Sequence, residues 1–401
     1  MWPAIAVLAS RLAAFISKPH FGFYFREGGT YNCRNGQVTV ADLSSFPPQE
    51  PTEPMLQDTN TAPSSCALPA PELLPALFSR YRNPDAIWSL TEVAVTLGPF
   101  VALWAAMWAL MHVSYWLSLA LALPAAGFLV RLFMIQHDCG HGAFFRTRLM
   151  NDWVGRVAGV LTLTPYDYWK RTHAAHHAAT GNLERRGLGD IETLTVNEYL
   201  ALGWRGRFAY RMYRHPLVLF AIGPTFLFLL QHRAPFGLMR GAGWKPWVST
   251  MSTNAAIATI VVLLMWLIGP AAFVMIHGPI FLLAATIGVW LFYVQHQFEG
   301  ATWAHARSWS LPEAALNGST YYDLPIVLRW FSANIGVHHV HHLASRIPFY
   351  RLPEVLSDFP ELANVNRLTL FQSLSCVNYA LWDEDTQRLI SFRTLGKRLR
   401  R

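Results

Sequence analysis

Two pairs of long apolar segments constrain the fold of this chain more than any other feature. Residues 91–112 and 114–135 form the first pair, and residues 253–276 and 277–296 form the second. A helix needs about 20 consecutive apolar residues to cross a bilayer, and each segment has that length. Only 14% of the 401 residues are charged, whereas a soluble domain usually has about 25%. The sequence therefore predicts an all-α integral membrane protein with four transmembrane helices.

Flanking charges predict the topology. The short link within each pair lacks Lys and Arg, while basic residues flank the outer ends. Because cytoplasmic loops carry the excess of Lys and Arg, both ends of each pair are expected in the cytoplasm. Two further apolar segments, residues 150–164 and 216–230, are too short to cross and are predicted to be re-entrant or interfacial helices. The expected location is a bacterial inner membrane, which the chain crosses several times.

The rest of the chain divides into three predicted regions. Residues 1–77 contain Pro-rich and Ser-rich stretches and are predicted to be a disordered arm. Residues 78–395 form the membrane domain. Residues 396–401 are a basic tail, for which contact with anionic lipid headgroups and a solvated terminus are equally favoured. The net charge of +8 lies beside apolar runs rather than on a polar fold, which argues against nucleic-acid binding.

Nine of the 16 histidines lie in three short clusters. The first is His137-Asp138-Cys139-Gly140-His141, and residues 173–177 and 338–342 both follow the pattern H-x-x-H-H. Helical positions i, i+3 and i+4 share one face, so each cluster is expected to direct its imidazoles at one point. His339 has the wrong offset for this face. Eight imidazoles exceed the four ligands of a tetrahedral zinc ion, so the clusters predict two metal ions with open coordination positions.

A ninth ligand is expected at the cytoplasmic end of the fourth span. His296 lies there, and the alternative is a histidine stabilised only by the helix dipole. His305 is a weaker candidate. The predicted ligands are His137, His141, His173, His176, His177, His296, His338, His341 and His342. Nearby polar residues are expected to hold the distal imidazole N–H groups, unless they are simply solvated: Asp138, Asp190, Glu299, Asp323 and Asn334.

These motifs resemble the three histidine boxes of membrane fatty acid desaturases. The matching stretches are residues 137–142 (HDCGHG), 173–177 (HAAHH) and 334–343 (NIGVHHVHHL). The likeness is greatest to the bacterial and plant acyl-lipid delta-12 (omega-6) type, and it extends into residues 292–300 and 345–350. It covers about residues 78–395. The resemblance implies four transmembrane helices, interfacial helices and a cytoplasmic helical cap that holds two iron ions.

The resemblance also implies an activity. In that family reduced iron activates O2, and a cis double bond is formed in the acyl chain of a membrane lipid or fatty acid, here delta-12. The two electrons are expected from a separate ferredoxin or cytochrome b5, which could dock on the basic stretches Arg185-Arg186 and Arg205-Gly206-Arg207. Membrane-surface contact is the alternative role for those arginines.

Two other functions remain open at this point. A histidine-box hydroxylase or carotenoid ketolase would use the same iron and O2 with a different outcome or substrate. A membrane metal transporter would instead place its ligands near the bilayer midplane. The histidine clusters gather beyond the span ends on one side, which disfavours transport.

Overall fold

The computed structural model describes residues 69–187, 189–235 and 243–400. Residues 1–68 of the predicted arm lie outside the described residues. The last part of that arm contains a short helix, α2 (Leu74–Leu77), and the side chains of Leu74 and Phe78 are buried in the core.

Four helices are long and apolar enough to cross a membrane, as the sequence predicts. They are α3 (Ala86–Met111), the helix Tyr115–His141 formed by α4 (Tyr115–Ala120) and α5 (Ala122–His141), α11 (Lys245–Ile268) and α12 (Pro270–His296). Together they indicate a membrane protein.

The boundary within the second pair was predicted wrongly. The chain breaks at Gly269, and not at residues 276–277. Gly269 has a φ of +88°, a conformation that glycine alone adopts readily, and Pro270 then begins the next helix with its fixed φ. Pro279, expected near the break, lies inside α12. The stretch contains two Gly-Pro pairs, Gly269-Pro270 and Gly278-Pro279. The first of them separates α11 from α12.

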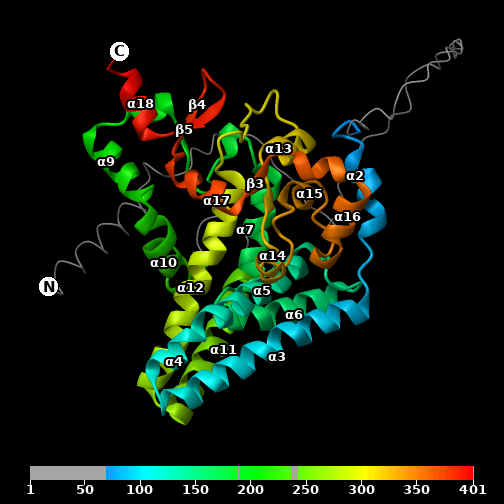
Figure 1. Cartoon of the computed structure of the whole chain (residues 1–401), viewed down its shortest axis with the longest axis vertical. Helices are drawn as coiled ribbons and strands as arrows, with labels where there is room; N and C mark the ends of the chain where they lie inside the picture. Colours follow the sequence, from blue (N-terminus) through cyan, green and yellow to red (C-terminus); the bar gives the residue numbers. More distant parts are fainter. Residues whose placement is uncertain (1–68, 188, 236–242, 401) are drawn as a thin grey trace, which may run out of the picture. The chain divides into compact units, whose positions relative to one another are not determined.

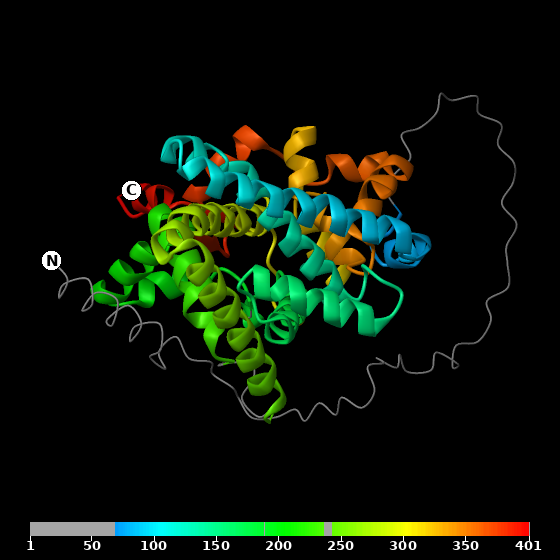
Figure 2. The ribbon, with the colours of Figure 1, turned by 90° about the horizontal axis from the view of Figure 1, so that it is seen from below.

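The inner pair of these helices is α5 and α12, which pack against each other. α3 contacts both of them, α11 contacts α12, and the two outer helices lie on opposite sides of the inner pair (Figure 2). A buried charge links this layer to the cap. The Arg131 guanidinium on α5 forms an ion pair with Glu92 on α3 and donates a hydrogen bond to the carbonyl of Trp330 in α14 (Ile326–Phe331).

The two shorter apolar segments are helical. Residues 150–164 correspond to α6 (Arg148–Leu161), which exposes Leu149, Trp153 and Val157 along one face, as an interfacial helix does. Residues 216–230 contain the π-helical turn η3 (Val218–Ile222) and α10 (Gly223–Leu229). With α9 (Trp204–Tyr213) this segment forms a pair bent by 58°, which fits a broken span or a re-entrant segment. That residues 216–230 lie at the membrane interface without crossing stays a prediction.

Beyond the span ends lies a cap of short elements (Figure 1). Besides α9 and α14, its helices are α7 (Tyr166–Ala179), α8 (Val196–Ala201), α13 (Leu311–Asn317), α15 (His338–Leu343), α16 (Leu352–Asp358), α17 (Leu370–Ser373) and α18 (Phe392–Arg398). Single turns add η1 (Phe78–Tyr81), η2 (Leu183–Arg185), η4 (Gln231–Arg233), η5 (Phe349–Arg351), η6 (Pro360–Asn364) and η7 (Leu374–Asn378).

Five short strands in the cap were not predicted. β1 (Leu194–Thr195), β4 (Leu381–Asp383) and β5 (Arg388–Ile390) form one sheet, in which β1 and β4 are parallel. β2 (Tyr321–Asp323) and β3 (Arg367–Thr369) form a second, parallel pair. Strands of two or three residues are too short to show the alternation that marks a strand in a sequence. The basic tail begins inside α18, where Arg398 forms an ion pair with Asp383 of β4.

Candidate metal centre

Four helices bring the histidine clusters together. His137 and His141 lie in the last two turns of α5, and His296 is the last residue of α12. α7 carries the second cluster and is fixed against α5 by a 2.8 Å hydrogen bond from the Tyr166 hydroxyl to the Cys139 carbonyl. α15 carries the third cluster. The loop before α15 packs against β2 so closely that a side chain at Gly336 would place its Cβ 2.3 Å from the Tyr322 carbonyl oxygen.

All nine predicted ligands lie in two groups that could each hold a metal ion. Within each group, one ring nitrogen from every member lies within 4.8 Å of the others. The first group contains His137, His141, His173, His177 and His341. The second group contains His176, His296, His338 and His342.

The expectation that each cluster points at one place is wrong for the second and third clusters. On α7, His173 and His177 belong to the first group, whereas His176 belongs to the second. On α15, His338 and His342 belong to the second group and His341 to the first. Successive residues of an α-helix project about 100° apart, because a turn holds 3.6 residues. The i,i+4 pair therefore stays together while the residue at i+3 faces the other group.

The nitrogen spacing indicates the coordination geometry. Nε2–Nε2 distances within the groups are 3.0 Å for His141–His173, 3.1 Å for His173–His177, 2.9 Å for His296–His338 and 3.1 Å for His338–His342. For a metal–imidazole bond of about 2.1 Å, ligands at a right angle lie about 3.0 Å apart, and tetrahedral ligands about 3.4 Å apart. The spacing therefore fits octahedral-type ions better than tetrahedral ones.

Five of the nine histidines are held in the neutral form that binds metal. Burial, together with the neighbouring imidazoles, holds the pKa of His173, His177, His338, His341 and His342 well below the usual histidine range. A neutral imidazole has one free lone pair, and the ring nitrogen opposite it carries a proton. The two groups therefore present lone pairs rather than positive charges to an incoming ion.

Two of the predicted acidic partners hold a distal N–H group. The Nδ1 atom of His137 lies 3.0 Å from the Asp138 carboxylate, whose other oxygen accepts a 2.7 Å hydrogen bond from the Phe349 backbone N–H. Asp190 contacts the Nδ1 atom of His176. A carboxylate that accepts from one ring nitrogen fixes the tautomer and leaves the other nitrogen free to bind metal.

A third such partner was missed because it is a backbone group. The Nδ1–H of His296 donates a 3.2 Å hydrogen bond to the carbonyl oxygen of Gly318. No side-chain pattern marks a carbonyl in this role, so no sequence signal could have found it.

Three other predicted partners contact no histidine of either group. Glu299 accepts a hydrogen bond from the Tyr379 hydroxyl, and Asn334 donates to the Phe349 carbonyl. Asp323 forms ion pairs with two arginines, Arg329 and Arg367. These residues are close to the clusters in sequence, but each has a stronger or nearer polar partner elsewhere in the cap.

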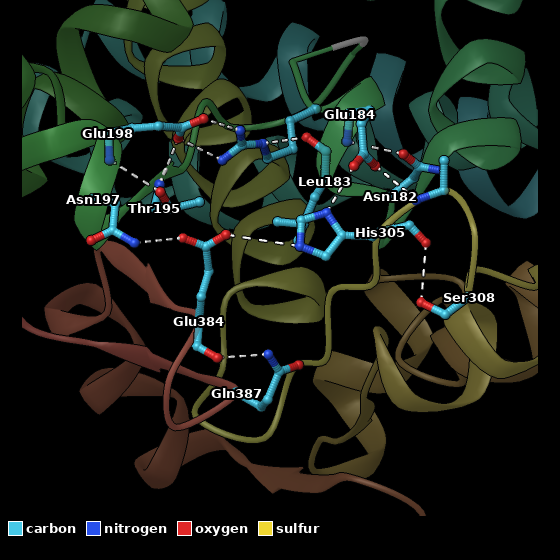
Figure 3. Close-up of polar contacts among 12 residues, drawn as sticks. Asn182, Leu183, Glu184, Thr195, Asn197, Glu198, His305, Ser308, Glu384 and Gln387 are labelled. Carbon is cyan, nitrogen blue, oxygen red and sulfur yellow. Dashed lines mark hydrogen bonds and ion pairs between the residues drawn. The ribbon is translucent and has the colours of Figure 1, made fainter. Parts of the chain in front are cut away.

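His305 lies outside both groups. Its side chain is 62% exposed. Figure 3 shows its ring between two carboxylates, with Nδ1 2.8 Å from Glu184 and Nε2 3.9 Å from Glu384. His339, excluded by its offset, is fully buried on another face of α15, near the ring of Tyr321. Its position in the helix therefore excluded His339 correctly from the predicted ligands.

Aromatic rings and a small cavity flank the groups. The Trp169 indole stacks on His173 at a centroid distance of 4.6 Å, and the Phe292 ring lies 5.0 Å from His176. A cavity of about 10 Å³, lined partly by Phe292, Asp190 and His296, adjoins the second group. This volume holds about one water-sized molecule.

Known proteins are similar to this chain in sequence. The family described as "Fatty acid desaturase" matches residues 114–372. A "Fatty acid desaturase" of Bacillus subtilis is 43% identical over 315 residues, which is 79% of this chain and 89% of that protein. Two Synechocystis proteins are more distant. The "sn-1 acyl-lipid omega-3 desaturase (ferredoxin)" is 28% identical over 55% of this chain and 61% of its own length. The "sn-1 oleoyl-lipid 12-desaturase" is 29% identical over 55% of this chain and 62% of its own length.

Proposed function

This chain belongs to the fatty acid desaturase family, and on that premise we propose that it is a di-iron, O2-dependent desaturase of membrane acyl lipids. The observation that supports the iron pair is the division of nine buried or half-buried histidines into two groups with octahedral-type spacing. A site of five imidazoles and a site of four each leave coordination positions open on an octahedral ion. Imidazole suits iron among the first-row metals, and open positions are what O2 chemistry requires.

When bound, the iron pair would supply O2 activation: with two hydrogens from the acyl chain, two external electrons and two protons, one O2 becomes two waters and a double bond forms. The chain's own residues prepare this chemistry. Asp138, Asp190 and the Gly318 carbonyl each hold an Nδ1–H group, so the Nε2 lone pairs of His137, His176 and His296 point inward. Because these histidines are already oriented, their rings would not have to rotate when a metal ion binds.

The proposed substrate is a membrane lipid that carries a monounsaturated chain, and the proposed product has a delta-12 double bond. The support is the resemblance of the histidine boxes and the likeness to a relative that is named an oleoyl-lipid 12-desaturase. A chain without polar groups offers only shape for recognition, so an apolar tunnel leading to the histidines is expected.

The proposed electron donor is a separate ferredoxin, with a cytochrome b5 as the alternative. One relative is named with ferredoxin as its donor. Of the four arginines in the basic stretches, Arg185 and Arg205 are exposed, whereas Arg186 forms an ion pair with Glu198 and Arg207 donates to backbone carbonyls. Arg185 and Arg205 are therefore the charges available to an acidic donor. The site is proposed to face the cytoplasm of a bacterial inner membrane.

The test is expression of the whole chain in a host that lacks diunsaturated lipids, followed by fatty-acid profiling and iron analysis. A new diunsaturated acid with two iron ions per chain is the expected result. The position of its double bond, read from cleavage products, tests delta-12 separately. A hydroxylated product, or no new product from iron-loaded protein, would contradict the proposed reaction.

A further inference from the structure

A large basic cavity that opens widely to the surface lies in the cap, and none of the grouped histidines lines it. Its volume is about 1050 Å³, and its walls come from α9, the loop after α12, η7 and the segment from β5 to α18. Five arginines and one carboxylate are the charged residues that line it. They are Arg211, Arg214, Arg388, Arg393, Arg398 and Glu299.

Most of this positive charge has no carboxylate partner. Arg398 forms an ion pair with Asp383, and Glu299 accepts a hydrogen bond from Tyr379. Arg388 and Arg393 are exposed, and neither forms an ion pair within the described part of the chain. The cavity therefore carries a positive charge that its own walls do not neutralise, which favours an anionic ligand.

The innermost arginine is buried. Arg214 is only 4% exposed, and its guanidinium donates to neutral oxygens, including the Tyr293 hydroxyl at 3.1 Å and the Gln297 side chain at 3.0 Å. No carboxylate lies within ion-pair distance of it among the described residues, and its Nε has no hydrogen-bond partner there. The Glu192 carboxyl is the acidic group that interacts with Arg214 electrostatically, but it does not form an ion pair with it. A guanidinium keeps its charge at any physiological pH, and a buried charge that is only partly offset is costly. A bound anion near this wall would offset that cost.

Apolar side chains beside the cavity indicate where the anion comes from. α9 exposes Trp204, Phe208 and Met212 at one-turn spacing, and the first two are 74% and 63% exposed. Arg211, on the same helix, faces the cavity and contacts the Tyr199 hydroxyl. A helix with an apolar stripe and a basic face is typical of the membrane interface. The cavity therefore lies within reach of lipid headgroups.

We propose that this cavity binds the phosphate of a membrane phospholipid. Guanidinium forks match phosphate oxygens in pairs, and Arg388 and Arg393 are free to make such contacts while Arg211 and Arg214 add charge behind them. The exposed apolar stripe on α9 favours an amphiphile as the ligand. An acidic protein would need only the arginines of the cavity to bind. The site is linked to the second histidine group, since Arg214 holds Gln297 and Gln297 follows His296 in the chain.

The test measures lipid binding by the full chain, purified in a neutral detergent, with native mass spectrometry. The probes are phosphatidylglycerol, diacylglycerol with the same acyl chains, and inorganic phosphate. Saturable binding of phosphatidylglycerol is expected, and diacylglycerol, which lacks the phosphate, should bind more weakly. The double variant Arg388→Gln, Arg393→Gln should bind phosphatidylglycerol about tenfold more weakly, the equivalent of losing one good charged contact. The control Arg307→Gln, Arg346→Gln removes two exposed arginines outside the cavity and should stay within about twofold, because it loses only general attraction.

Three results would overturn the proposal. They are equal losses in the two double variants, unchanged binding in the cavity variant, and binding of inorganic phosphate with no binding of phosphatidylglycerol. Loss of ferredoxin binding in the cavity variant, with lipid binding intact, would assign the cavity to a protein instead. Binding requires neither iron nor turnover, so an inactive enzyme that still binds the lipid would count against the proposed reaction alone.

Discussion

The Nε2 atoms of His296 and His338 lie 2.9 Å apart, although 42 positions separate the two residues in the chain. One ring ends a membrane-spanning helix, and the other begins a short helix of the cap. The membrane layer therefore contributes directly to the second histidine group, and the cap alone could not complete it.

His296→Ala should remove one ligand of the second group and leave the first group complete. We expect bound iron to fall from about two ions per chain to about one, and turnover to fall more than about 100-fold, beyond the loss that outer partners of a metal ligand cause. His305→Ala is the matched control, because His305 lies outside both groups. Metal analysis and fatty-acid profiling measure the two effects. Two retained ions in His296→Ala would show that this residue is not a ligand.

Neighbouring histidines on α15 should affect different ions. His341 belongs to the first group and His342 to the second. His341→Ala leaves four histidines in the first group, as many as the intact second group has, so both ions should be retained and only the first should change its surroundings. His342→Ala leaves three histidines in the second group, so bound iron should fall towards one ion per chain. Metal analysis and Mössbauer spectroscopy on ⁵⁷Fe-loaded protein distinguish the two variants. Identical spectra from the two variants would mean that both residues serve one ion.

Asp190→Ala should weaken metal binding without removing a ligand. Asp190 holds the Nδ1 side of His176, and the loss of such a partner costs about 10–100-fold in metal affinity. Asp190→Asn should retain part of the affinity, because its amide oxygen still accepts the hydrogen bond. Asp323→Ala removes a carboxylate that pairs with arginines instead, and iron content should not change. A chelator titration compares the three proteins, and equal losses in Asp190→Ala and Asp323→Ala would argue for a general folding effect.

The buried ion pair between Arg131 and Glu92 should act as a unit. Arg131→Met leaves the Glu92 carboxylate unpaired in the membrane layer, and breaking a buried pair in this way costs about 3–5 kcal/mol. The double variant Arg131→Met, Glu92→Leu removes both charges and should recover most of that loss. Thermal unfolding of the detergent-solubilised protein compares the double variant with the two single variants, Arg131→Met and Glu92→Leu. Additive losses in the double variant would show that the two side chains are not coupled.

Local patterns in the sequence predicted the features that depend on neighbouring residues. The four apolar helices follow from segment length, and the nine grouped histidines follow from their i,i+3,i+4 spacing. The division of α7 and α15 between two groups depends on which helices meet on each side of them, so spacing alone could not give it. The role of the Gly318 carbonyl leaves no side-chain pattern because it is a backbone group, and the strands are too short to show alternation.

The basic cavity could not be predicted from local sequence patterns either, because the residues that line it are far apart in the chain. Arg211 and Arg398 line the same cavity, although nearly half of the chain lies between them. Each arginine, seen in sequence, is one of many beside apolar runs. Only their convergence in the cap, where five arginines and one carboxylate line the same cavity, distinguishes them.

On both α7 and α15, a single helical turn supplies ligands to both groups, and this has a consequence for how the enzyme can change. Within these two helices, the separation between the two histidine groups is fixed by the pitch of one helix, which its backbone hydrogen bonds maintain. Substitutions elsewhere in the chain do not change that pitch. Residues that surround the substrate can therefore diverge, and change which bond is oxidised, while the distance between the two histidine groups stays constant.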